Sequence, residues 1–455
     1  MVALSLQSCA KKMDATLHGG DVVFDSVSTD TRTLRKGQLF VALVGEKFDA
    51  HEKIDASVCD RALGFVVNRE LDVDVPQLIV SDTLRALGDL ARQWRERINA
   101  PIVAITGSNG KTTVKEMTAA ILRQRGNVFS TVGNLNNEVG MPLSMMSTSE
   151  SHEYIVLELG ANHAREIEYL TEIARPHAAI VNNAGPSHLE GFGSLDGVAR
   201  AKGEIYSGLG DDGIAIVNID DDYADYWLGL TADLTCITFG MSQQADVRGE
   251  LDENQRLRID YKGHSSTVTL PVPGRHNAMN ALAASAVSFA VGATLKDAVA
   301  GLKSMRGVSG RLQFKPGQNG ARIIDDSYNA NPGSLAAAID VLAGLPEGRK
   351  ICALGEMREL GENAAGIHRE MGALAFEKGI DSLFVTGEFA RHYATGFGKG
   401  ASEFSDHESL ASALINELDD QTYVLVKGSR GARMERVVEL LVDPINHNNK
   451  GEQQC

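Results

Sequence analysis

The segment TGSNGKTT, residues 106–113, has the residue types and spacing of a phosphate-binding loop. Gly107 and Gly110 let the backbone wrap around a phosphate, and the first N–H groups of a following helix would point at that anion. Lys111 adds a positive charge, and the hydroxyl of Thr112 can bind Mg²⁺. The residue before the segment is isoleucine where the usual spacing has glycine, which indicates a shortened variant. The alternative is a glycine turn beside a surface lysine.

Two further polar residues follow apolar segments that read as neighbouring strands. Glu158 ends the run YIVLELG, and His188 comes after AAIVNNAG. The carboxyl ends of parallel strands form the edge where such sheets bind ligands. A carboxylate and an imidazole at that edge, beside a phosphate loop, suit a divalent cation. Taken alone, Glu158 could equally be a helix cap, and His188 could equally be a loop histidine with its hydrogen bonds satisfied.

Other polar residues carry weaker signals when they are taken singly. Lys202 reads as a solvated helix lysine, and the polar groups at strand ends and helix starts are more often caps than catalysts. The segment STDTR near the N-terminus could contact an anion or a uridine, but the bare pattern is no better than a turn. These weaker candidates are Ser28, Thr29, Asp30, Thr31, Arg32, Lys202, Asn277, Asn280, Arg311 and Asp326.

The elements that must position these residues alternate between strand and helix. From residue 102 the order is strand (IVAIT), glycine turn and helix, and continuous apolar strands separated by helical stretches indicate a parallel sheet covered on both faces. Asp82 is predicted to cap a helix over residues 84–98, which Pro101 would end. RLRIDY and STVTLPV predict an antiparallel hairpin. Strands after residue 314, again spaced by helices, indicate a separate Rossmann-like unit.

Length and composition agree with several α/β domains. At about 150 residues per domain, 455 residues predict roughly three. We place them at residues 1–82 (a small α/β domain), 83–313 (the central parallel-sheet domain with the phosphate loop) and 314–455 (the Rossmann-like domain). The net charge is −16, with no basic tract that would indicate nucleic-acid binding. Any anionic substrate should therefore be held by a local site rather than by the overall field.

Cysteine usage and hydropathy predict a cytoplasmic protein. The five cysteines form no CxxC pair, so neither a zinc site nor a disulfide framework is indicated. No window approaches about 18 uninterrupted apolar residues, so we expect no membrane insertion.

Taken together, these segments resemble the Mur ligase family, the ATP-dependent amide-bond synthetases of peptidoglycan assembly. The resemblance spans the chain and follows the family's order through the STDTR segment, TGSNGKTT, GNLNNEVGMPLS, the Glu158 strand, His188, Lys202, GRHNAMN, Arg311 and DDSYNANP. DSYNANPGS, LGEMRELGENAAGIHREMG and VKGSRGARMERVV are most similar to the members that add D-alanyl-D-alanine to UDP-N-acetylmuramoyl-tripeptide. The resemblance implies that activity, an acyl-phosphate intermediate, and products ADP, phosphate and the UDP-linked pentapeptide.

The resemblance also implies a role for each matching residue. ATP would be held by Thr106, Gly107, Ser108, Asn109, Gly110, Lys111, Thr112, Thr113, Asn277, Asn280, Arg311 and Asp326. Magnesium, as two ions, would be bound by Thr112, Glu158, His188 and Lys202, with Lys202 carried as a carbamate. The uridine nucleotide would contact Ser28, Thr29, Asp30, Thr31 and Arg32, in the first domain. The muramoyl-peptide end would contact Asn134, Asn136 and Asn137, and the dipeptide would contact Asn329 and Asn331, in the last domain. Catalysis would rest on Lys111, Lys202, His188, Arg311 and Asp326, in a monomer whose domains close around the substrates.

Three other readings share parts of the pattern. A folylpolyglutamate-type ligase would more often carry glycine and serine after the loop lysine, where Thr112 and Thr113 stand here. A ligase that adds diaminopimelate typically has a DNPR segment, which this sequence lacks. A P-loop switch or non-catalytic nucleotide-binding module leaves Glu158, His188 and Lys202 without a role. ATP turnover with and without D-alanyl-D-alanine separates that last reading from a ligase.

Overall fold

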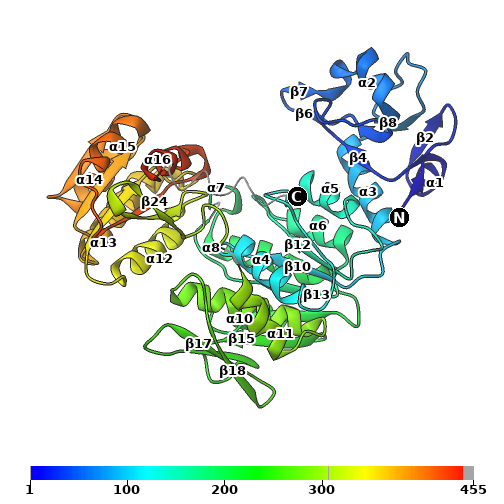
Figure 1. The fold of residues 1–455 in the computed structure, drawn as a ribbon. Coiled ribbons are helices and arrows are strands. Elements are labelled where there is room, and N and C mark those ends of the chain that lie inside the picture. Colours follow the sequence, from blue (N-terminus) through cyan, green and yellow to red (C-terminus); the bar gives the residue numbers. More distant parts are fainter. Residues whose placement is uncertain (1, 188, 306, 444–455) are drawn as a thin grey trace.

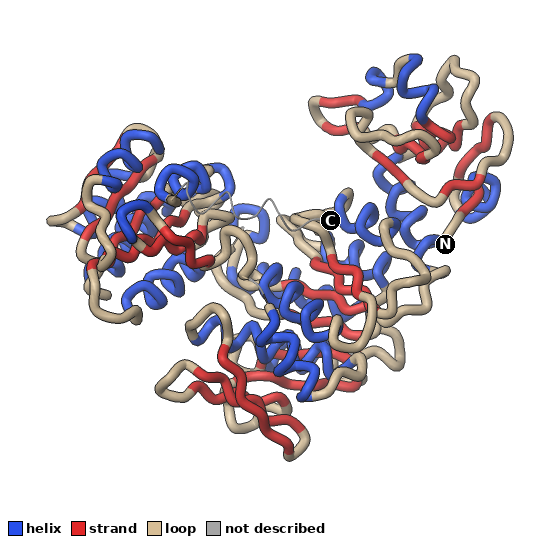
Figure 2. Tube along the Cα trace, in the orientation of Figure 1, coloured by secondary structure: helices blue, strands red, loops and turns tan. Residues whose placement is uncertain are grey.

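The computed structural model describes residues 2–187, 189–305 and 307–443, and it confirms the predicted three-domain α/β fold. Figure 1 shows three lobes in chain order: the blue N-terminal domain, the cyan-to-green middle domain and the yellow-to-red C-terminal domain, with the middle domain between the other two. Each lobe contains its own main sheet, and helices cover the sheets of the two larger lobes on both faces (Figure 2).

The N-terminal domain contains a five-stranded sheet in the order β2-β9-β8-β5-β4. Only the β2–β9 pairing in this sheet is antiparallel. Two small antiparallel pairs, β1–β3 and β6–β7, lie beside it. The strands are β1 (Leu4–Ser5), β2 (Ala15–His18), β3 (Val23–Phe24), β4 (Val27–Ser28), β5 (Gln38–Val41), β6 (Val44–Gly45), β7 (Phe48–Asp49), β8 (Ala62–Val67) and β9 (Gln77–Val80), and the helices are α1 (Leu6–Lys12) and α2 (Ala56–Arg61).

The middle domain is built on a nine-stranded sheet in the order β11-β12-β10-β13-β14-β15-β16-β17-β18, parallel except for its last two pairings. Its strands are β10 (Ile102–Thr106), β11 (Val128–Ser130), β12 (Tyr154–Glu158), β13 (Ala178–Val181), β14 (Ile214–Asn218), β15 (Thr235–Gly240), β16 (Val247–Leu251), β17 (Arg256–Tyr261) and β18 (His264–Thr269). Its helices are α3 (Thr83–Arg95), α4 (Lys111–Leu122), α5 (Gly140–Met146), α6 (Glu166–Ala174), α7 (Leu189–Phe192), α8 (Leu195–Gly203), α9 (Ala224–Leu230), α10 (Arg275–Ala290) and α11 (Leu295–Ser304). The predicted hairpin is confirmed as β17 and β18.

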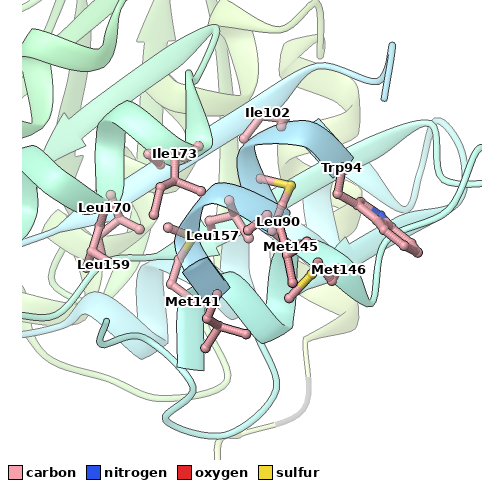
Figure 3. Packing of buried hydrophobic residues seen from close by; sticks show 14 of the residues in the cluster. Leu90, Trp94, Ile102, Met141, Met145, Met146, Leu157, Leu159, Leu170 and Ile173 are labelled. Carbon is pink, nitrogen blue, oxygen red and sulfur yellow. The ribbon is translucent and has the colours of Figure 1, made fainter. Parts of the chain in front are cut away.

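Burial on both faces explains the uninterrupted apolar strands of this sheet. In β10, Ile102 and Ala104 pack into the core under α3, α5 and α6, whereas Val103 and Ile105 pack into the opposite core under α4, α10 and α11. Figure 3 shows the first of these cores, where the ring of Trp94 lies beside methionines of α5. Since successive side chains of a strand point to opposite faces, a strand covered on both sides must be apolar throughout.

Helix α3 begins as predicted and ends earlier. The carboxylate of Asp82 accepts hydrogen bonds from the N–H groups of Leu84 and Arg85, which confirms the N-cap. The helix ends at Arg95, three residues before the predicted end at Ile98. The chain tightens there into i→i+3 hydrogen bonds, and the Arg95 guanidinium donates to the carbonyl of Ala174 at 2.8 Å. A tertiary contact therefore fixes the end, ahead of the proline.

The C-terminal domain has a six-stranded sheet in the order β19-β20-β24-β21-β22-β23, in which only β19 is antiparallel to its neighbour. The strands are β19 (Gln313–Pro316), β20 (Arg322–Asp326), β21 (Arg349–Leu354), β22 (Ser382–Thr386), β23 (Ala401–Phe404) and β24 (Thr422–Lys427). The helices are α12 (Pro332–Ala343), α13 (Ala364–Glu377), α14 (Ala390–Phe397), α15 (His407–Ile415) and α16 (Glu435–Leu441). Short 3-10 helices occur in all three domains. They are η1 (Ala50–Lys53) in the N-terminal domain, η2 (Glu204–Gly208) in the middle domain, and η3 (Gln318–Gly320), η4 (Gly361–Asn363) and η5 (Arg430–Ala432) in the C-terminal domain.

Within the described ranges, the structure contains no helix that is both long enough and apolar enough to cross a membrane.

Candidate active site

The predicted phosphate loop lies between β10 and α4. Gly107 and Gly110 have φ angles of 150° and 79°, and Gly110 is the N-cap of α4. A Cβ on Gly110 would lie 2.3 Å from Oδ1 of Asn280, so the position has neither the conformation nor the space for a side chain. The first N–H groups of α4 have no partner within the helix, as binding of a phosphate requires.

Lys111 closes over the loop that precedes it. Its Nζ donates to the carbonyl of Gly107 at 2.6 Å and to that of Ser108 at 3.3 Å. Burial lowers the pKa of Lys111, while the nearby carboxylate of Glu158 acts in the opposite direction. An ammonium that is poorly solvated and bonded only to carbonyls would gain energy by binding an anion at this position.

Two asparagines that the sequence analysis did not select fix the loop from the end of β13. The N–H of Asn109 donates to Oδ1 of Asn183 at 2.8 Å. Nδ2 of Asn182 donates to the carbonyl of Asn109 and to Oδ1 of Asn280, both at 2.9 Å. The signal was present, since both asparagines end the predicted strand AAIVNNAG and so lie at the ligand-binding edge of the sheet.

Glu158 lies at the end of β12 and has one carboxylate oxygen without a protein partner. Oε1 accepts a hydrogen bond from Nδ2 of Asn136 at 2.8 Å. The backbone N–H of Glu158 donates to Oγ1 of Thr131, which fixes the residue in the sheet. Oε2 is buried and has no hydrogen-bond partner. Such an oxygen is costly to leave unpaired, so it fits a site for a cation.

Lys202 is buried at the end of α8, beside the phosphate loop. Its side chain is 1% exposed, and Nζ lies 5.3 Å from the centre of the Phe192 ring. Burial, and after it the charge of Lys111, lowers the pKa of Lys202 to about 7, against the opposing effect of Glu166 and Glu204. A large share of this amine is therefore neutral near pH 7. The interpretation of Lys202 as a solvated helix lysine is therefore wrong, because its side chain is buried.

The predicted metal ligand His188 lies outside the described residues. Within them, no group of three or more His, Cys, Asp or Glu side chains is placed to hold a metal ion.

Arg311 lies in the segment just before β19, where the chain passes from the middle to the C-terminal domain, and it reaches the phosphate loop. Its Nη2 lies 3.4 Å from Oγ1 of Thr112, and its guanidinium stacks over the ring of Tyr328 at 4.3 Å. Nε of Arg311 is buried without a partner. The arginine therefore places a positive charge at the boundary between the two domains, with donor capacity left for an anion.

Asp326 forms a buried ion pair with Lys427, a residue that the sequence analysis did not select. Lys427 donates from the end of β24 to Oδ2 of Asp326 and to the carbonyl of Asn329 at 2.9 Å. Oδ1 of Asp326 accepts from the N–H of Leu312, next to Arg311. Burial lowers the pKa of Lys427, and Asp326 opposes that shift. Asp326 thus holds the segment that carries Arg311.

Asn331 connects the two larger domains directly. Its Oδ1 caps α12 by accepting from the N–H of Ser334, and its Nδ2 donates to Oδ1 of Asn109 in the phosphate loop at 2.7 Å. Asn329 accepts through Oδ1 from the N–H of Arg430 at 3.2 Å. The helix cap and the contact between domains occupy the Asn331 side chain. The hydrogen bond that Asn329 accepts from Arg430 uses its Oδ1 and not its Nδ2.

Two cavities open between the middle and C-terminal domains. The first cavity has a volume of about 430 Å³ and is lined by Asn109, Asn277, Asn280, Arg311, Asp326 and Lys427, among others. The second cavity has a volume of about 420 Å³ and is lined by Lys111, Asn134, Asn136, Asn137, Glu158 and Arg311 on one side. Asn329, Asn331, Arg358, Ser429, Arg430 and Gly431 line its C-terminal-domain side. Most of the predicted site residues are therefore brought together along these two cavities.

Buried polar atoms without partners concentrate at the second cavity. Among the described residues, seven buried side-chain N or O atoms have no hydrogen-bond partner, and four belong to residues that line this cavity. These four are Glu158 Oε2, Ser187 Oγ, Arg311 Nε and Ser429 Oγ. Because native proteins satisfy most buried polar groups, such a concentration indicates a site for a polar ligand.

The segment from Ser28 to Arg32 lies in the N-terminal domain and lines neither cavity. Its main feature is an ion pair in which the Arg32 side chain donates to both oxygens of Asp30. Hydrogen bonds from Arg32 lower the pKa of Asp30 to about 2. The segment therefore lies apart from the two cavities along which most of the predicted site residues gather.

Known proteins that resemble this chain show the family to which it belongs. Residues 105–288 match the protein family described as Mur ligase middle domain. Residues 310–430 match the family described as Mur ligase, glutamate ligase domain. The UDP-N-acetylmuramoyl-tripeptide–D-alanyl-D-alanine ligase of Escherichia coli K12 is 43% identical over 448 residues, covering 97% of this chain and 99% of that protein. This chain belongs to the Mur ligase family.

Solved structures point to one group within the family. A crystal structure of MurF from Acinetobacter baumannii matches with a TM-score of 0.90 and 34% identity, over 96% of this chain and 98% of that one. A MurF ligase from Thermotoga maritima in complex with ADP matches with a TM-score of 0.81 and 29% identity, over 91% and 96%. The chain is therefore placed with the UDP-N-acetylmuramoyl-tripeptide–D-alanyl-D-alanine ligases.

Proposed function

We propose that this chain joins D-alanyl-D-alanine to UDP-N-acetylmuramoyl-tripeptide in the second cavity, with ATP bound in the first. The observation that carries this proposal is the shared lining of the second cavity: Lys111 and Glu158 from the middle domain face Asn329 and Arg430 from the C-terminal domain. A ligase must bring a phosphoryl donor, a carboxylate and an amine to one point, and a cavity between two domains can receive them from different sides.

The chemistry requires activation of a carboxylate, which is a poor electrophile at neutral pH. Transfer of the γ-phosphoryl group of ATP to the terminal carboxylate of the tripeptide gives an acyl phosphate and ADP. The free amine of the dipeptide attacks the acyl carbon, the C–O bond to phosphate breaks, and the nitrogen loses a proton. The protein's task is to position these groups and to neutralise their negative charge. We assign this role to Lys111 and Arg311, which both line the second cavity.

ATP is assigned to the first cavity for two reasons. Asn277 and Asn280 at the start of α10 line it together with the phosphate loop, and Asp326 with Lys427 closes it from the C-terminal domain. The Thermotoga maritima relative, which covers 91% of this chain, was solved with ADP. The phosphate loop residues 106–113 would hold the phosphates where the first cavity meets the second.

Magnesium fits the residues between the two cavities. The unpartnered Oε2 of Glu158 and the hydroxyl of Thr112 are the hard oxygen ligands that this ion prefers, and His188 stays a proposed ligand. One or two bound Mg²⁺ ions would supply charge neutralisation of the phosphate oxygens. In the protein itself, Asn136 orients the Glu158 carboxylate through its other oxygen.

Lys202 is proposed to act as a carbamate. The neutral amine nitrogen adds to the carbon of CO2 and loses a proton to give the carbamate. Burial and the charge of Lys111 favour the neutral amine here. The modification reverses the charge of the side chain and gives two oxygens next to the cationic Lys111, where an unmodified ammonium is repelled. The alternative is an ammonium that pairs with an ATP phosphate.

Chemical rescue of Lys202→Ala is expected to separate these two roles. Because a carbamate supplies carboxylate oxygens, acetate or formate should partly restore the turnover lost in this variant, whereas small amines should not. The measurement is phosphate release at saturating substrates with increasing rescue agent, and Lys111→Ala serves as a variant that carboxylates should not rescue. Restoration by amines alone would show that the side chain works as an ammonium.

The remaining substrate contacts are assigned from the same resemblance. Asn134, Asn136 and Asn137 line the second cavity beside Glu158 and would contact the muramoyl-peptide end. Ser28 to Arg32 would hold the uridine nucleotide on the N-terminal domain. A long substrate that spans from that domain to the second cavity is consistent with domains that close upon binding. We further propose a monomer that acts in the cytoplasm.

The test of this function is phosphate release with ATP, Mg²⁺, the UDP-tripeptide and a panel of amine acceptors. We expect release to require both the UDP-tripeptide and D-alanyl-D-alanine, with formation of the UDP-pentapeptide. Phosphate release that is indifferent to the dipeptide would instead indicate a nucleotide-dependent switch.

Asn329→Ala is expected to raise the KM for D-alanyl-D-alanine about tenfold and to leave the KM for ATP nearly unchanged. The reason is that the Asn329 amide orients the Arg430 segment and lines the dipeptide side of the second cavity. Steady-state kinetics with each substrate varied in turn measures this selectivity. Asn331→Ala serves for comparison, because loss of its helix cap and of its bond to Asn109 should affect the ATP side as well. Equal losses for all three substrates in Asn329→Ala would contradict the assignment.

A further inference from the structure

We propose that Arg358, Ser429 and Arg430 bind the free carboxylate of the acceptor dipeptide at the C-terminal-domain end of the second cavity, an inference that rests on the proposed function. These residues come from two loops, one after β21 and one after β24, which lie at the same edge of the C-terminal sheet because β21 and β24 are parallel neighbours. All three line the second cavity.

Ser429 provides the observation that points to a ligand. Its side chain is 3% exposed, yet its hydroxyl has no hydrogen-bond partner. Its backbone is fully engaged, since the N–H donates to the carbonyl of Glu356 and the carbonyl accepts from Ala432. A buried hydroxyl in a cavity that Arg358 and Arg430 also line has a donor to offer to an anion.

The guanidinium of Arg358 is held in place with donors to spare. Its Nε donates to Oε1 of Glu356 at 2.8 Å, and Nη2 lies 2.7 Å from the same oxygen. The opposite side of the group packs on Gly431, where an added Cβ would lie 2.2 Å from Nη1. The loop itself is fixed from the core, because the N–H of Met357 donates to Nε2 of the buried His368 at 2.9 Å. The position of Nη1 is therefore fixed, and its N–H donors are not used by Glu356.

Arg430 approaches the same end of the cavity from the next loop. Its N–H donates to Oδ1 of Asn329, its Nη1 lies 3.0 Å from the Glu435 carboxylate, and its guanidinium lies 5.8 Å from the centre of the Tyr328 ring. These contacts hold the guanidinium but occupy only part of its five N–H donors. Two forked cations and a buried hydroxyl that line the same cavity offer the donors that a planar, doubly accepting carboxylate requires.

The two ends of the cavity match the two ends of the acceptor. A two-residue peptide extends about 7 Å, so its carboxylate and its amine can lie at opposite ends of one cavity. With the carboxylate held by the C-terminal domain, the amine points toward Lys111 and Glu158, where the acyl phosphate would form. In a chain with a net charge of −16, capture of the acceptor's carboxylate depends on such local cations. The site would thereby select a free dipeptide acid and set its direction.

The decisive experiment compares D-alanyl-D-alanine with D-alanyl-D-alaninamide, which lacks the negative charge but keeps the amine. For the unmodified enzyme, kcat/KM for the amide should be lower by about tenfold or more, as expected for loss of a charge-assisted contact. In Arg358→Ala and Arg430→Ala, kcat/KM for the acid should fall by about ten- to a hundredfold, while that for the amide should change little. Ser429→Ala should give a smaller change of the same kind. The KM values for ATP and the UDP-tripeptide should stay near those of the unmodified enzyme.

Arg436→Ala is the matched control, because Arg436 is an exposed arginine six residues beyond Arg430 and lines neither cavity. It should keep the full preference for the acid. Both arginine variants should fold as the unmodified enzyme does, because the side chains of Arg358 and Arg430 are 58% and 66% exposed. If the arginine variants keep the preference, or the unmodified enzyme has none, the carboxylate pocket is wrong. If the unmodified enzyme uses neither acceptor, the proposed function itself fails.

Discussion

Lys111→Ala is expected to lose about 3 kcal/mol or more of transition-state stabilisation, which is a fall of more than about a hundredfold in kcat/KM. The lysine is the first residue of α4, its ammonium is bonded only to carbonyls of its own loop, and it lines the cavity where phosphoryl transfer is proposed. A cation at that point stabilises charge that spreads over the phosphoryl oxygens during transfer. The measurement is phosphate release under saturating and limiting ATP.

The fold of this variant should survive, since alanine keeps the helix and the glycines keep the loop. Lys296→Ala, at an exposed lysine of α11 in the same domain, should retain full activity. Trp94 and Trp227 are both buried in the middle domain, so tryptophan fluorescence reports whether that domain stays folded. A folded Lys111→Ala protein with near-normal turnover would rule out the phosphate-loop assignment.

Lys427→Met is expected to destabilise the C-terminal domain by about 3–5 kcal/mol, because it leaves the Asp326 carboxylate buried without its partner. Lys427 and Asp326 are 3% and 7% exposed, and the lysine also donates to the carbonyl of Asn329. The variant should therefore weaken both the sheet edge and the segment that lines the second cavity. Amide hydrogen exchange in β20 and β24 measures the effect in the domain concerned, while tryptophan fluorescence follows the middle domain separately.

Lys378→Met is the matched comparison for this variant. Lys378 pairs with Asp340 in the same domain at 2.6 Å, but both side chains are about half exposed. Surface pairs contribute about 0–1 kcal/mol, so exchange should hardly change. The double variant Lys427→Met/Asp326→Asn should recover part of the loss, because it removes the unpaired charge. Unchanged exchange in Lys427→Met would mean that the pair does not hold this sheet edge.

Part of the site could be predicted because its determinants are local in the chain. The glycines, the lysine and the helix start of the phosphate loop are consecutive, so their conformation follows from a few neighbouring residues. The apolar runs at β10, β12 and β13 similarly placed Glu158 at a strand end. Lys202 shows the limit of this reasoning, because a helix lysine is usually solvated and only packing reveals that this one is buried.

The sequence by itself thus determined the alternation of strands and helices, the three-domain α/β class and the phosphate loop, since periodicity and loop chemistry act over short distances. Only the tertiary structure decided which loops meet. Asn331 contacts Asn109 across 222 residues, and Lys427 reaches Asp326 across 101. The order of strands in a parallel sheet sets such contacts, and that order depends on the packing of the whole domain rather than on any segment. For the same reason Lys427 and Arg358 carried no signal of their own until the sheet edges brought them to the two cavities.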